Sequence, residues 1–314
     1  MTAVLNSVLP LFALVLVGYG AMRFRALSPE GLAGLNRFVY VFALPVMLFF
    51  TMARSPLDGL FDWRIVAAYS GASVTVFVAA LLLMPLLFPG RSIAERTVVA
   101  GAGSFSNIAY LGVPLVIGAF GPGVGAPAGL ILLADNLILI PLIMAFLEGS
   151  TGSRTSPLRL VGKVLAGFAR NPFLLGMLAG AVWGILRLPL PEPVLRFGDL
   201  LGGAAGPCAL FALGGSLYGR PIAEGRAEVG FASLLKLFAH PALAAVAAFW
   251  IFGLPDEIAV LVVAIAALPT GANIFVLASQ YEAAVARAST VVLVTTGMAV
   301  VTVSGLLLYL AGRT

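Results

Sequence analysis

Long apolar blocks run through almost the whole chain and limit what it can fold into. Each block is close to the roughly 20 residues that a helix needs to cross the hydrocarbon core of a bilayer. Strands of a transmembrane barrel would be about half as long and would alternate in polarity, which these blocks do not. The sequence therefore predicts an all-α polytopic membrane protein with ten transmembrane helices, at approximately 5–22, 32–53, 65–88, 97–119, 125–147, 169–187, 197–219, 229–252, 257–281 and 288–310.

The composition agrees with this fold class. Of 314 residues, 61% are hydrophobic and 10% are charged, whereas about 25% of residues are charged in soluble domains. A soluble globular protein is thereby excluded. The net charge of +5 comes without a basic tract, so we expect the lipid bilayer rather than nucleic acid as a partner. The single cysteine, Cys208, excludes a disulfide framework and cysteine-cluster metal sites, and we expect no metal and no cofactor.

The basic residues predict an orientation, because Lys and Arg accumulate in cytoplasmic loops. No basic residue precedes the first block, which favours a retained helix over a secretory signal. With both termini outside, twelve basic residues fall in inside loops and five fall outside, with Lys236 left inside a span. The inside set is Arg23, Arg25, Arg37, Arg91, Arg96, Arg154, Arg159, Lys163, Arg170, Arg220, Arg226 and Arg287, and the outside set is Arg54, Arg64, Arg187, Arg196 and Arg313.

A polar stretch at 148–168 divides the chain into two halves with five predicted spans each. An odd number of spans in each half forces the two halves into opposite orientations. We therefore predict a first five-helix repeat at 1–147, a cytoplasmic linker at 148–168, and a second five-helix repeat at 169–314. Short matches between equivalent spans support this 5+5 inverted repeat, and they pair Pro45–Phe49 with Pro207–Phe211 and Asn107-Ile108 with Asn273-Ile274.

Spans four and nine each contain a segment that Gly and Pro would interrupt. In secondary transporters with inverted repeats, the substrate binds near the midplane where such discontinuous helices meet. Helix ends supply free N–H groups that suit a carboxylate, and Asn supplies both a donor and an acceptor. We therefore predict substrate binding at these segments, with simple kinks or packing contacts as the alternative. The candidate residues are Ser106, Asn107, Gly112, Pro114, Pro269, Thr270, Gly271 and Asn273.

Few ionisable residues lie inside the spans, and each is a candidate for ion or proton coupling. Asp135 is the acid at mid-span, with Asn136 beside it, and a structural hydrogen bond is its alternative role. Lys236 and His240 are four residues apart and share a helix face. Lys236 could pair with Asp135, add positive potential for an anion, or reach to the membrane interface. His240 could carry protons or remain a neutral, hydrogen-bonded side chain.

The segments Ser106–Leu115 and Leu268–Ala278, followed by Tyr281, resemble the auxin efflux carrier family. This family includes bacterial malonate-type carriers and the plant PIN proteins, and the resemblance covers essentially the whole chain. It implies a fold like that of bile-acid sodium symporters, with helices 4 and 9 crossing at their unwound centres. A scaffold would comprise helices 1, 2, 6 and 7, and a transport domain would comprise helices 3–5 and 8–10.

The same resemblance implies elevator-type alternating access and a homodimer formed through the scaffold helices. The short linker favours the bacterial branch, and hence a bacterial-type inner (plasma) membrane. We therefore expect a secondary transporter of small organic anions, either a dicarboxylate such as malonate or an auxin-like aromatic carboxylate. A coupled proton or sodium ion is compatible with the residues.

The alternatives are a channel and a membrane-embedded enzyme. One mid-span acid, one histidine and one cysteine supply neither a catalytic pair nor a ligand cluster, so we expect no enzymatic activity. The residues leave the exact substrate, the coupling ion and the direction of transport open.

Overall fold

The computed structural model describes residues 2–54, 62–150, 162, 166, 169–219 and 225–311. Within these residues the regular elements are helices, together with one isolated β-bridge between Ser106 and Thr270. The prediction of an all-helical polytopic membrane protein is confirmed. Most of the predicted linker at 148–168 lies outside the described residues, as do the positions of Arg154, Arg159, Lys163, Arg220 and Arg313.

Six helices in the described part of the chain are long and apolar enough to cross a membrane. At about 1.5 Å per residue, a helix of 25 residues exceeds the roughly 30 Å of a bilayer core. The six are Pro29–Ala53, Trp63–Leu87, Gly125–Ser150, Glu192–Leu217, Arg226–Ile251 and Val285–Leu306, and shorter apolar helices are Pro10–Arg23, Ile108–Phe120 and Pro172–Ile185. The number of ten spans stays a prediction.

The chain forms two compact units, and each takes segments from both halves of the sequence. The first unit comprises Met1–Asp62, Ala109–Leu130 and Leu165–Gly219, and the second unit comprises Trp63–Ile108, Ile131–Val164 and Arg220–Thr314. Helices that are distant in the chain therefore pack together within each unit.

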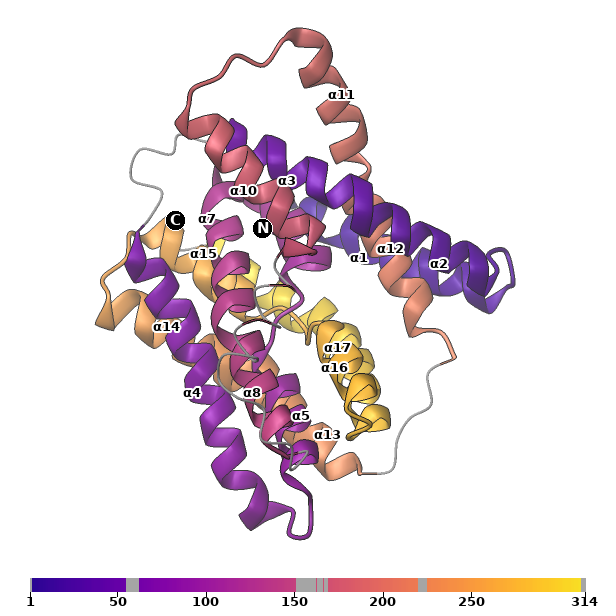
Figure 1. Ribbon diagram of the computed structural model, residues 1–314, viewed down its shortest axis with the longest axis vertical. Coiled ribbons are helices and arrows are strands. Elements are labelled where there is room, and N and C mark those ends of the chain that lie inside the picture. Colours follow the sequence, from indigo (N-terminus) through magenta and orange to yellow (C-terminus); the bar gives the residue numbers. More distant parts are fainter. Residues whose placement is uncertain are drawn as a thin grey trace. The chain divides into compact units, whose positions relative to one another are not determined.

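In the first unit, α1 packs against α12 and α3 packs against α10 (Figure 1). A side chain on Gly176 or Gly180 of α10 would strike the α3 backbone at Pro45 or Phe49. Small residues four apart let two membrane helices approach closely in this way. The elements of this unit are α1 (Thr2–Arg23), α2 (Pro29–Phe38), η1 (Val39–Ala43), α3 (Leu44–Ala53), α6 (Val113–Phe120), η3 (Pro122–Val124), α10 (Pro172–Ile185), α11 (Glu192–Gly203) and α12 (Ala205–Leu217).

The second unit has an apolar core to which α4, α5, α8, α13, α16 and α17 contribute, including Phe77, Met84, Val99, Leu147 and Val291. Its elements are α4 (Trp63–Leu87), α5 (Ile93–Ser104), η4 (Asp135–Leu139), α8 (Ile140–Ser150), α13 (Arg226–Leu234), η5 (Leu235–Ala239), α14 (His240–Ala245), η6 (Val246–Ile251), α15 (Asp256–Ala266), α16 (Asn273–Gln280) and α17 (Val285–Ala311). Two elements, η2 (Ile108–Gly112) and α7 (Gly125–Ala134), pass from one unit to the other.

Ion pairs join the N-terminal ends of three helices in the second unit. Arg287 of α17 binds Glu95 of α5, with 2.8 Å between Nη1 and Oε1. Arg91 binds Glu228 of α13, with 2.7 Å between Nη2 and Oε1. Ser92 and Glu95 form a capping box, in which each side chain accepts the backbone N–H of the other residue. These contacts fix where α5 begins, and α5 is the helix that leads to the candidate site.

Candidate functional site

Two helices of the second unit stop inside the protein, one in each segment predicted to be interrupted. The first, α5, ends at Ser104, and Phe105 takes an extended conformation with φ −85° and ψ 124°. The second, α15, ends at Ala266, and α16 begins only at Asn273. Pro269 lies in this gap, where it lacks an N–H group and disfavours helix in the residue before it.

The two interruptions lie side by side and are joined by backbone hydrogen bonds. Asn107 N–H donates to the Pro269 carbonyl at 2.9 Å, and Gly271 N–H donates to the Phe105 carbonyl at 3.1 Å. The Thr270 hydroxyl also donates to the Ala102 carbonyl at 2.6 Å. Backbone groups freed by a broken helix must find partners inside a membrane protein. Here each interruption supplies partners for the other.

Gly271 permits this close approach. A Cβ atom at this position would lie 2.6 Å from the Phe105 ring and 2.9 Å from the Ser106 carbonyl oxygen. Both distances are far shorter than ordinary van der Waals contacts between these atoms. Glycine is therefore required here by space.

Some polar side chains at the paired interruptions remain without a hydrogen bond. Asn107 is 4% exposed, and its amide nitrogen Nδ2 is buried without a partner. The Ser106 hydroxyl is likewise buried without a bond of standard geometry, with the Tyr69 hydroxyl as a polar neighbour. Asn273 is exposed at the first position of α16. A buried polar group without a partner costs about 1–3 kcal/mol, so the Asn107 and Ser106 donors do not contribute to the stability of the fold.

The remaining predicted substrate residues belong to the first unit. Gly112 immediately precedes α6, and Pro114 is in the first turn of that helix. Pro114 packs close to Gly206, the second residue of α12. The structure thus brings together Ser106, Asn107, Pro269, Thr270 and Gly271 within the second unit, while Gly112 and Pro114 are part of the first unit.

Lys236 is fully buried and stabilises one of the broken helices. Its Nζ donates to the carbonyl of Ala266, the last residue of α15, at 2.6 Å. A cation is favourable at a helix C-terminus, where carbonyl groups lack partners within the helix. Lys236 therefore lies buried beside the second interruption and does not extend to the membrane interface, which was one of the roles expected for it.

A chain of hydrogen bonds continues from Lys236 to α4. Lys236 Nζ lies 2.9 Å from His240 Nδ1, and His240 Nε2 lies 2.9 Å from the Ser73 hydroxyl. The Ser73 hydroxyl donates to the Tyr69 carbonyl at 3.1 Å. A protonated lysine can only donate. In a neutral His240, Nδ1 therefore accepts from Lys236 Nζ, and Nε2 donates to the Ser73 hydroxyl. Each of these side chains then has a hydrogen-bond partner.

Asp135 is buried at the start of η4, and its carboxylate oxygens make no hydrogen bond of standard geometry. Its polar neighbours are Lys236, the Ser106 backbone and the Tyr69 hydroxyl. Asp135 therefore lies between the first interruption and Lys236, although no direct ion pair joins the two side chains among the residues described. Asn136 points elsewhere, because its amide donates to the Leu132 carbonyl at 2.8 Å.

Sequence reasoning missed Ser73, Tyr69 and Thr295 as parts of this region. The Thr295 hydroxyl accepts the Thr270 N–H at 3.1 Å. Each of the three is one of several polar residues in a long and mostly apolar helix, α4 or α17. That polarity is a weak signal, because Ser and Thr also bond to their own helix backbone.

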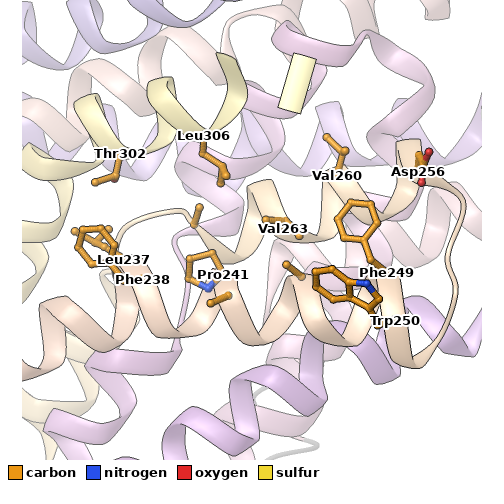
Figure 2. A pocket seen from close by; sticks show the side chains of 13 residues that line it. Leu237, Phe238, Pro241, Phe249, Trp250, Asp256, Val260, Val263, Thr302 and Leu306 are labelled. Carbon is orange, nitrogen blue, oxygen red and sulfur yellow. The ribbon is translucent and has the colours of Figure 1, made fainter. Parts of the chain in front are cut away.

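A separate apolar cavity of about 1000 Å³ lies in the second unit among η5, α14, η6, α15 and α17. Figure 2 shows Phe249 and Trp250 of η6 beside Val260 and Asp256 of α15. The predicted substrate and coupling residues do not line this cavity. It is therefore distinct from the paired interruptions.

Comparison with known proteins identifies the family. The family model described as "Membrane transport protein" matches residues 3–307. The chain belongs to this family. It is a membrane transporter and not an enzyme, and the resemblance to auxin efflux carriers is confirmed.

Three relatives illustrate the range of this family. A protein of Rhizobium meliloti (strain 1021) named "Putative malonate transporter" is 34% identical over 308 residues, covering 98% of this chain and 96% of the relative. The uncharacterized transporter YfdV of Escherichia coli (strain K12) is 25% identical, with 90% of each chain covered. Auxin efflux carrier component 4 of Arabidopsis thaliana is 26% identical over 146 residues, which cover 46% of this chain and 23% of the plant protein.

Proposed function

We propose that this chain is a secondary transporter of small organic anions that binds its substrate at the paired interruptions. The observation that carries the proposal is the buried Asn107 amide nitrogen, which has no hydrogen-bond partner where two broken helices meet. A malonate-like dicarboxylate and an auxin-like aromatic carboxylate are the substrate classes that the names of the relatives support.

The donors around the interruptions suit an anion that must be released again. Asn107 and Ser106 offer neutral side-chain donors, and the start of α16 at Asn273 offers backbone N–H groups with partial positive charge. A buried Arg would hold a carboxylate more tightly, through charge-assisted bonds. Neutral donors bind more weakly, which favours turnover over retention.

The division into two units supports elevator-type alternating access. In this proposal the first unit is the scaffold, through which a homodimer forms, and the second unit carries the interruptions and moves. The underlying fold would be the ten-span inverted repeat with crossed helices 4 and 9. The second unit is suited to moving as one body, because ion pairs join α5, α13 and α17 at their N-terminal ends.

Asp135 and Lys236 are the groups we propose for coupling to a proton or to sodium. Asp135 lies beside the Ser106 backbone and Lys236, and Lys236 binds the end of α15. A change of charge at Asp135 would therefore be felt at both interruptions. His240 would position Lys236 through its Nδ1, and Asn136 is the candidate with the least support, because its amide bonds within its own helix.

Counterflow of labelled malonate or phenylacetate in proteoliposomes tests the proposal. We expect Asn107→Ala to reduce counterflow at least about tenfold, as loss of a hydrogen bond to a charged ligand predicts, and Asn273→Ala to reduce it as well. Asn36→Ala is the matched control, because that amide donates to the Leu32 carbonyl of its own helix, α2, in the unit that does not carry the paired interruptions. Undiminished counterflow in both site variants would refute the assignment. Unitary currents in place of saturable counterflow would indicate a channel.

A further inference from the structure

A second cavity, of about 670 Å³, lies entirely within the first unit, so it is separate from the paired interruptions. Glycines and apolar side chains form most of its lining. Among the lining residues there is one cation, Arg54, and one acid, Asp199. The full lining is Leu11, Met47, Phe50, Thr51, Arg54, Pro114, Ile117, Gly118, Gly123, Gly198, Asp199, Gly202, Gly203, Gly206 and Pro207.

Arg54 is held at this cavity by three contacts. Its Nη1 lies 2.7 Å from Asp199 Oδ1, and its Nη2 donates to the Leu195 carbonyl at 3.4 Å. Its guanidinium carbon also lies 5.0 Å from the centre of the Phe50 ring. The ring and the carbonyl keep the guanidinium in place independently of Asp199. Arg54 would therefore stay positioned if another carboxylate replaced that of Asp199.

The ion pair is exposed on the protein surface near the ends of two predicted spans, since the Arg54 and Asp199 side chains are 40% and 63% exposed. Exposed ion pairs contribute only about 0–1 kcal/mol to stability. A guanidinium group binds any carboxylate in the same forked geometry. A carboxylate ligand can therefore replace Asp199 at little cost in folding free energy.

We propose that this cavity is an access site for carboxylates, in which Arg54 exchanges the Asp199 carboxylate for that of the substrate. One cation recognises one carboxylate group, and the apolar lining accommodates an apolar body. The cavity should therefore favour an aromatic or aliphatic monocarboxylate over a compact dicarboxylate. This inference rests on the proposed transport function, and the predicted orientation, with Arg54 outside, assigns it to the outer face.

The two partners of the ion pair provide a test, because the inference predicts opposite effects for them. KM for phenylacetate would be measured at each face, by uptake into right-side-out and inside-out vesicles. We expect Arg54→Gln to raise KM at one face by about tenfold or more, the usual loss for a charge-assisted hydrogen bond. Asp199→Asn should lower KM at that face, since the competing carboxylate is removed. We expect kcat to change less than about twofold in both variants.

The Arg196–Glu192 pair is a matched control, because it lies on α11, the helix that carries Asp199. Its side chains are 76% and 66% exposed, and neither residue lines the cavity. We expect Arg196→Gln and Glu192→Gln to leave KM unchanged. If the Arg54–Asp199 pair were only structural, Arg54→Gln and Asp199→Asn would change KM in the same direction or not at all. That outcome would overturn the inference.

A substitution that narrows the cavity tests the role of its apolar lining. Gly203 lines the cavity, and a Cβ atom there would meet no atom within 4 Å. We expect Gly203→Leu to raise KM for phenylacetate more than KM for malonate. Gly34→Leu is the control, because Gly34 also has open space but does not line the cavity. Equal effects on both substrates would contradict the preference for an apolar body.

The same measurements distinguish the access site from transport itself. If the unmodified protein shows no counterflow of any carboxylate, the transport proposal itself fails. If it transports but the Arg54 and Asp199 variants match the controls, only the access site is refuted.

Discussion

At the residue scale, single residues with a backbone consequence shape the paired interruptions, because Pro removes a donor and Gly allows close approach. Pro269 and Gly271 predicted an interruption, and the helix stops at Ala266. Ser73 and Tyr69 could not be predicted, because their importance comes from helices that meet only in the folded chain. The same is true of Lys236, whose partner at the end of α15 is 30 residues away in sequence.

Gly271 gives the first prediction at this scale. We expect Gly271→Ala to lower the free energy of unfolding by about 1–3 kcal/mol, the usual cost of overpacking, because its methyl group would displace the Phe105 ring. Thermal unfolding in detergent and malonate counterflow would both report the change. Gly297→Ala on α17 is the control, since a Cβ atom there meets nothing within 4 Å. Equal unfolding temperatures for the two variants would show that the interruptions do not need this glycine.

Asp135 gives the second prediction. If its carboxyl group couples transport to an ion, Asp135→Asn should abolish the pH or sodium dependence of uptake, because an amide neither releases a proton nor offers a charged ligand. Substrate exchange without a gradient should persist. Asp256→Asn is the control, since that acid lies at the start of α15 and is exposed. An unchanged ion dependence in Asp135→Asn would place coupling elsewhere.

At the element scale, apolar length located most helices within a few residues. The block at 65–88 corresponds to α4 at Trp63–Leu87, and the block at 169–187 corresponds to α10 at Pro172–Ile185. Blocks 97–119 and 257–281 are equally apolar but contain the interruptions. Hydropathy alone could not show this, because the residues that break a helix there are themselves small or apolar.

The N-terminal end of α5 gives a prediction about pH. Partial burial opposes ionisation of Glu95, but bonds from Arg287 and the Ser92 N–H outweigh it and lower the pKa of this carboxyl below its ordinary value. A lowered pKa in the folded state stabilises the protein above the unfolded pKa, about 4.3, and this stabilisation is lost as pH falls through the folded pKa.

Glu95→Gln should therefore reduce stability near pH 7 by about 1 kcal/mol or less, the typical contribution of a partly exposed ion pair, because glutamine keeps the capping bond to the Ser92 N–H but loses the charge that pairs with Arg287. It should also flatten the loss of stability below about pH 5, because glutamine does not titrate. Thermal unfolding between pH 4 and pH 8 would measure both effects. Glu192→Gln, in the exposed pair with Arg196, is the control. If the stability of Glu95→Gln fell below pH 5 as steeply as that of the unmodified protein, the role of Glu95 would be contradicted.

At the scale of the whole molecule, composition points to a boundary at the polar linker, whereas the compact units interleave segments from both halves. Contiguity in the chain does not determine contiguity in space when helices from different halves pack together. Interleaving gives each unit several connections to the other. Within the described residues, the crossings occur between Asp62 and Trp63, between Ile108 and Ala109, and between Leu130 and Ile131. A transporter that moves one unit must bend at these points.

Pulsed electron spin resonance on labelled cysteines would test this motion. Cysteines for labelling would replace glycines in a Cys208→Ala background. The pair at Gly71 and Gly230 reports a distance within the second unit, and the pair at Gly34 and Gly71 reports a distance between the two units. All three positions leave open space for a Cβ atom. We expect malonate to shift the distribution for the Gly34–Gly71 pair while the Gly71–Gly230 distribution stays fixed, because an elevator moves one unit as a rigid body. A shift within the second unit comparable to that between the units would refute the elevator and favour local gating around the interruptions.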